Sequence, residues 1–185
     1  MNYDRLVAAA REAGAAKATV INREQIVLSR SFRDICAGNG CGNYGRCWMC
    51  PPDVGEIDTL MEKVGCFPRG LLYQSIVPLE DSFDIEGMTA GARAHARLSL
   101  RVDDAVRPLL LGERFHLSCG GCRLCDRCTK PDGLPCRHPE QALPSLESCG
   151  IDVYNTVRDT DLHYTNGQNT VTFFGLLLFS EVRHG

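Results

Sequence analysis

The sequence lacks the features that mark a membrane or exported protein. No run of apolar residues approaches the roughly 18 needed to cross a bilayer, and the segment FFGLLLF near the carboxyl end is long enough only for a buried strand. The amino terminus has no basic stretch followed by an apolar run, so we expect no export signal. These absences predict a soluble, cytoplasmic protein with no membrane partner.

Familiar catalytic and nucleotide-binding motifs are also missing. The glycine-rich stretch GNGCGNYG follows no clear strand and contains a cysteine, so it does not predict a dinucleotide site. No phosphate loop and no hydrolase triad can be identified. The formal net charge of −3 and the shortage of aromatic residues beside basic ones make nucleic acid a poor expected partner.

Cysteine, by contrast, is abundant, with eleven in 185 residues. In a reducing cytosol, clustered thiols more often bind metal or carry out redox chemistry than form disulfides, and an odd number cannot all pair. Nine of the eleven lie in two segments, 36–52 and 119–139. We expect both segments to be cluster-binding loops of a single domain that spans residues 1–185.

The second segment contains three overlapping C-x2-C units and a later cysteine followed closely by proline. In bacterial ferredoxins, this kind of spacing wraps three thiolates around one cluster and takes a fourth from the more distant cysteine. It predicts a [4Fe-4S] cluster held by Cys122, Cys125, Cys128 and Cys136, with Cys119 as a surplus candidate. Zinc is the alternative, although structural zinc usually draws its thiolates from two separated C-x2-C pairs.

The first segment, CAGNGCGNYGRCWMCPP, contains Cys36, Cys41, Cys47 and Cys50. Its spacing matches no ordinary zinc or ferredoxin motif, but its glycine and asparagine content is typical of a loop folded around a centre. Three cysteine ligands would leave one iron open to a substrate or small anion. A fourth would close the cluster and suit electron transfer. Cys47 decides between these possibilities, and the spacing leaves its role open.

Charged and titratable residues near these segments suggest supporting roles. From Arg114 to Arg137 the chain has five basic residues and two acidic ones, which we interpret as compensation for negative charge on thiolates. His116 and His138 flank the second segment and are candidates to hydrogen-bond a cluster. We expect Cys66 to be a core residue, and Cys149 to be a buried structural thiol with ligation as the alternative.

Hydrophobic periodicity predicts an α/β or α+β fold with one sheet of about four or five strands flanked by helices. The expected helices cover residues 3–14, 53–65 and 82–111, the last broken near Pro108. Strands are expected over residues 69–79 and 169–179, with two short strands or a hairpin within 17–29 and two short elements around a turn at Gly150. Asp53 and Glu56 have the spacing of a capping box, which would point a positive helix end at the first segment.

In their order and in their residues, these motifs resemble those of a family of predicted metal-binding proteins, domain of unknown function 2284. The resemblance rests on C....C..YGR...CPP, CGGCRLC..C.......CRHPE and PSLESCGIDVY, and it covers most of the chain. It implies a metallocluster without an agreed reaction. It marks as ligands Cys36, Cys41, Cys50, Cys122, Cys125, Cys128 and Cys136. Cys47 stands where relatives are expected to have a small polar residue, and Cys119 is similarly optional.

Three functional classes follow from these observations. The leading hypothesis is a small redox enzyme in which a ferredoxin-like cluster serves a second cluster with an open iron. The alternative is an electron carrier or accessory protein, and the third is a zinc-stabilised interaction module. The first two would take a redox partner protein or a small-molecule substrate.

Overall fold

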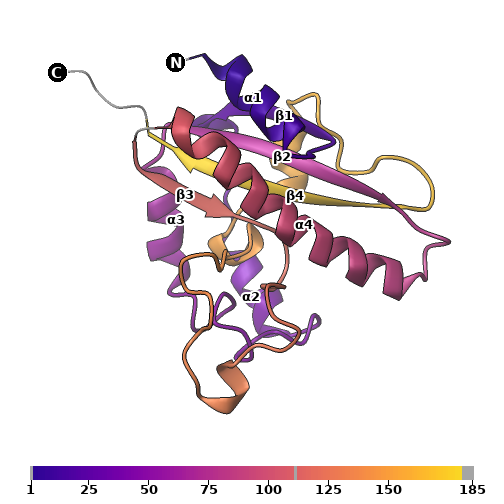
Figure 1. The fold of residues 1–185 in the computed structure, drawn as a ribbon. Coiled ribbons are helices and arrows are strands. Elements are labelled where there is room, and N and C mark those ends of the chain that lie inside the picture. Colours follow the sequence, from indigo (N-terminus) through magenta and orange to yellow (C-terminus); the bar gives the residue numbers. More distant parts are fainter. Residues whose placement is uncertain (1, 111, 181–185) are drawn as a thin grey trace.

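The computed structural model describes residues 2–110 and 112–180, which are built around one four-stranded sheet (Figure 1). Its strand order is β1-β2-β4-β3, and every neighbouring pair is antiparallel. The strands are β1 (Lys17–Asn22), β2 (Arg69–Pro78), β3 (Arg114–Leu117) and β4 (Thr170–Phe179). The fold is therefore α+β, with a number of strands in the expected range.

Helices cover both faces of this sheet. On one face lie α1 (Tyr3–Glu12) and α4 (Ile85–Val106), and on the other lie α3 (Ile57–Gly65) and α5 (Val153–Val157). The short α2 (Ser31–Ala37) contacts the turn Glu147–Cys149 instead of the sheet. Within the described residues, no helix is both long and apolar enough to cross a bilayer.

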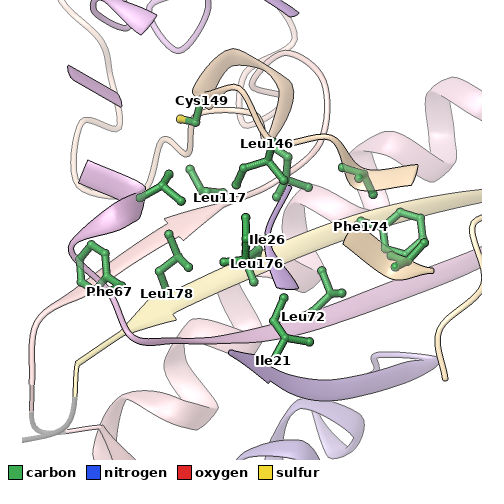
Figure 2. Packing of buried hydrophobic residues seen from close by; sticks show 14 of the residues in the cluster. Ile21, Ile26, Phe67, Leu72, Leu117, Leu146, Cys149, Phe174, Leu176 and Leu178 are labelled. Carbon is green, nitrogen blue, oxygen red and sulfur yellow. The ribbon is translucent and has the colours of Figure 1, made fainter. Parts of the chain in front are cut away.

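Side chains along the two central strands, β2 and β4, alternate between the two faces of the sheet and so divide the core into two layers. Leu72, Leu176 and Leu178 face α3 and α5, whereas Leu71 and Leu177 face α1 and α4. This is the period of two that a strand buried on both faces requires. Figure 2 shows the first layer, in which Cys149 lies at the opposite end of the view from Ile21. Cys149 is fully buried, as expected of a structural thiol.

A buried polar chain connects β2, α4 and β3. The Tyr73 hydroxyl donates to Ser99 Oγ at 2.8 Å and lies 2.9 Å from His116 Nε2, while Ser99 Oγ lies 3.1 Å from Ser118 Oγ. Because the Tyr73 proton goes to Ser99, the His116 Nε2–H donates to Tyr73. Burial lowers the pKa of His116 to about 4, so this imidazole is neutral near pH 7. The chain ends at Ser118, immediately before Cys119, and so anchors the start of the second cysteine segment.

Several expected elements are confirmed. The helix at the amino terminus and the strands β2 and β4 lie where periodicity places them. The long helix ends at Val106, before a 3-10 turn that contains Pro108, as the proline predicts. The Asp84 carboxylate caps the start of this helix by accepting from the Gly87 N–H at 2.7 Å.

Other expectations are wrong. Helix α3 begins at Ile57, not at Asp53, and no side chain caps it. The Asp53 carboxylate instead pairs with Lys130 of the second cysteine segment, so no helix starts directly behind Cys50. Cys66, the residue that follows α3, is exposed and does not belong to the core.

Two more differences concern strands. Residues 17–29 form one strand, a 3-10 turn and a single bridge from Leu28 to Ile151, not a hairpin. The edge strand β3 was not expected, since its four residues RFHL are too few for a clear alternation.

Gly175 in the middle of β4 makes room for Tyr73 and leads to a stability prediction. The two residues face each other across the strand pair, and a Cβ on Gly175 would lie 2.2 Å from the Tyr73 ring. Overpacking of this kind costs about 1–3 kcal/mol, so Gly175→Ala should lower the free energy of unfolding by about that amount in urea titrations. Gly65→Ala is the matched control because its Cβ meets nothing closer than 4.0 Å. Equal stability of the two variants would contradict this packing.

Candidate metal centre

The two cysteine segments lie together at the end of the molecule away from α1 (Figure 1). The Trp48 Nε1–H donates to the Leu134 carbonyl at 3.1 Å. The Lys130 ammonium lies 4.2 Å from the centre of the Trp48 ring and pairs with the Asp53 carboxylate. This Lys130–Asp53 pair is largely shielded from solvent. These contacts join two loops that are far apart in sequence, so cysteines from both loops can share one pocket.

The first hollow, here called the five-sulfur pocket, lies between the two loops and has about 360 Å³ of empty space, part of it open to solvent. Its cysteines are Cys47, Cys122, Cys125, Cys128 and Cys136. All four cysteines chosen from the ferredoxin-like spacing line it. The structure adds Cys47, which the spacing had left with the first segment.

Cys47 belongs to the first segment but lines the pocket of the second. Interactions with the Cys50 and Cys128 thiols and with the backbone N–H groups of Met49 and Cys122 lower its pKa. The hydrogen bond with Cys50 is the main reason that the pKa of Cys47 falls to about 6, against the opposing effect of burial. The same contact and burial raise the pKa of Cys50. The interaction between Cys47 and Cys50 therefore favours ionisation of Cys47 over that of Cys50.

The other sulfurs of the five-sulfur pocket are held by their own loop. Burial raises the pKa of Cys122 to about 11, with smaller contributions from the neighbouring thiols. The His138 backbone N–H donates to the Cys136 sulfur at 3.4 Å. Such N–H···S hydrogen bonds tune thiolate ligands in iron–sulfur proteins. His138 also lines the pocket. His116, a residue of β3, belongs instead to the buried polar chain that contains Tyr73.

The second hollow, here called the three-sulfur pocket, is lined by Cys36, Cys41 and Cys50. Its empty space of about 730 Å³ includes open solvent, and the cavity itself has a volume of about 260 Å³. Burial, followed by the nearby Cys41, raises the pKa of Cys36. The structure thus groups the three cysteines that the family resemblance marks in the first segment, and Cys47 is not among those that line their pocket.

Four residues of the three-sulfur pocket come from elsewhere in the chain: Gly120, Gly121, Ser145 and Glu147. Gly121 packs against Asn43, and a Cβ there would lie 2.8 Å from the Asn43 side chain, so a larger residue would force this side chain to move. Glu147 lines the pocket beside Ser145 and Gly120. Burial raises the pKa of Glu147. The sequence analysis missed Glu147 because nothing in its spacing connects it with Cys36.

The remaining cysteines lie outside both pockets. Cys119 is half-buried near Glu147, and desolvation raises its pKa to about 12. Burial likewise raises the pKa of Cys149 to about 11. All eleven cysteines belong to the described part of the chain and have free thiols there. Within that part, no three His, Cys, Asp or Glu side chains are close enough together to hold a single metal ion.

Comparison with known proteins places the chain in a family. The model of the DUF2284 family, described as a predicted metal-binding protein, matches residues 19–179. This range includes both cysteine segments and all of β2, α4 and β4. No curated protein and no solved structure matches the chain. With most of its length matched, the chain belongs to the DUF2284 family of predicted metal-binding proteins.

Proposed function

We propose that the chain is an iron–sulfur protein with two centres, a [4Fe-4S] cluster in the five-sulfur pocket and a second, open centre in the three-sulfur pocket. The observation that carries this proposal is the division of eight cysteines into a group of five and a group of three, each around its own hollow. The ferredoxin-like spacing of Cys122, Cys125 and Cys128 supports iron in the larger group.

The donor chemistry of the five-sulfur pocket supports a cluster over zinc. Its metal-ligating side chains are all thiols except Met49 and His138, and thiolates suit iron–sulfur clusters and zinc alike. A structural zinc site, however, needs four ligands closed around one ion. Here five cysteine sulfurs line one hollow, and in the described part of the chain no three of them converge closely enough to hold a single ion, which favours a multi-atom cluster. We assign Cys136 as the fourth ligand and Cys47 as a neighbour that donates no bond to the metal.

The three-sulfur pocket supports an enzymatic role. When bound with three protein ligands, an open iron supplies a position at which a substrate or small anion binds and is polarised. Its cavity of about 260 Å³ lies just below the usual range for drug-sized ligands, so it suits a small substrate or anion. Tyr44 and Pro51 provide an apolar wall, and Glu147 offers a carboxyl group for hydrogen bonding to a bound molecule. We therefore favour a small redox enzyme over a carrier.

Iron, sulfide and zinc analysis of anaerobically purified protein tests this proposal. We expect iron and acid-labile sulfide in equal amounts, at about four of each for every cubane cluster, and a brown colour that bleaches in air. A colourless protein with stoichiometric zinc would instead identify a zinc-stabilised module. Reconstitution with iron and sulfide must precede the analysis, so that loss of a labile cluster during purification is not counted as absence.

A further inference from the structure

A cleft with a concentration of arginines borders the five-sulfur pocket. It is lined by Arg46, Arg93, Arg123, Arg127, Asp126 and the sulfur-bearing residues Cys47, Cys122, Cys125 and Cys128. The arginines come from three parts of the chain: the first cysteine segment, α4 and the second cysteine segment. One carboxylate accompanies four guanidinium groups, in a chain whose formal net charge is −3. The charge of this surface is thus opposite to that of the chain as a whole.

The charges of this cleft face solvent. All four arginines are exposed. Arg127 pairs with Asp132 at 2.6 Å, and Arg93 lies 3.6 Å from Asp126, whose side chain is 98% exposed. In the described part of the chain, Arg46 and Arg123 have no acidic partner within ion-pair distance. Two guanidinium groups are therefore available to an outside partner.

Compensation of thiolate charge, the interpretation drawn from the sequence, does not account for these arginines. All four guanidinium groups belong to exposed residues at the surface of the cleft. Exposed charges are screened by water and salt, so they stabilise a neighbouring anion weakly.

We propose that this arginine cleft is the docking surface for an acidic one-electron carrier protein. Positive charge spread over a rim steers an oppositely charged protein surface and raises its association rate. A small anion is the weaker fit because its site would need buried polar groups that converge on one point. The proposal rests on the proposed function, in which the sulfurs below the cleft hold a cluster. One electron passes from the reduced carrier to that cluster, the carrier is oxidised by one electron, and no atom is transferred.

Association with a reduced plant-type ferredoxin, a highly acidic carrier, tests the docking surface. The double variant Arg46→Glu with Arg123→Glu should lower the association rate constant at least tenfold at low ionic strength. Raising the salt concentration should slow the wild type and have little effect on the variant. Arg5→Glu with Arg11→Glu is the matched control, because both arginines are exposed on α1 and the change in charge is identical. This control should associate like the wild type.

Separate readouts distinguish docking from cluster binding. Iron and sulfide are measured in every sample before the kinetics, and wild-type protein that contains no iron would overturn the proposed function itself. Normal iron with equal association rates in the two double variants would overturn only the docking surface. Titration with inorganic phosphate tests whether the cleft binds a small anion instead of a protein. Phosphate binding that is lost in the Arg46 and Arg123 variant, together with unchanged ferredoxin kinetics, would assign the cleft to a small anion and overturn the proposal.

Discussion

Cys128→Ser should remove the cluster of the five-sulfur pocket and about half of the bound iron, if both pockets hold clusters of equal size. Cys128 lies between Cys125 and Cys136 in the ferredoxin-like series and lines the five-sulfur pocket with them. Its loss therefore removes one ligand of the proposed cluster. Because metal binding energy is also folding energy in such loops, protease cleavage within residues 119–139 should accelerate markedly.

Cys66→Ser is the control for this loss. Cys66 is exposed at the end of α3 and lines neither pocket, so its replacement should leave the iron and sulfide content unchanged. Full iron in Cys128→Ser, measured beside this control, would show that the ferredoxin-like assignment is wrong.

Cys41→Ser should abolish the response to small ligands while leaving the five-sulfur cluster in place. Cys41 lines only the three-sulfur pocket, where it is one of three sulfurs. Removing one of three ligands leaves too few to hold the centre, so its iron should be lost. Cyanide should change the electron paramagnetic resonance spectrum of the reduced wild type, because an open iron accepts it, and should leave that of the variant unchanged.

Cys47→Ser gives the contrasting result that separates enzyme from carrier. Because Cys47 lines the five-sulfur pocket, where four other cysteines are present, the variant should keep its iron and its cyanide response. If the variant loses half of its iron and the wild type ignores cyanide, Cys47 is the fourth ligand of the centre held by Cys36, Cys41 and Cys50, both clusters are closed and the protein is an electron carrier.

The sequence predicted the elements that carry a long periodic pattern. The apolar stripe of α4 and the apolar residues of β2 and β4 each extend over ten or more residues. A local pattern of this length determines the type of element largely without help from tertiary contacts. Short elements were harder to predict. The four residues of β3 form a strand because β4 offers a free edge to pair with, and this partner cannot be identified from the spacing of Arg114–Leu117. The sequence analysis assigned Asp53 to a helix cap. Its actual partner, Lys130, lies 77 residues away in the chain, so local spacing could not reveal the pair.

The candidate site shows the same limit. Spacing grouped Cys122, Cys125, Cys128 and Cys136 because their separation along the chain matches a known geometry, and all four line one pocket. Cys47 could not be placed in this way. Its position follows from the Trp48 and Lys130 contacts that join the two loops, and these depend on the folded chain. Glu147 was missed for the same reason.

The sharing of one pocket by two distant loops has a consequence for chain entropy. Cys47 and Cys122 are about 75 residues apart, and β2, β3 and the helices α3 and α4 lie between them. Neither proposed centre takes ligands from both loops, so a cluster in either pocket would not cross-link them. Closing a loop of this length costs on the order of 4 kcal/mol of chain entropy. The Trp48 and Lys130 contacts between the loops therefore oppose a cost that is a large fraction of the typical stability of a domain.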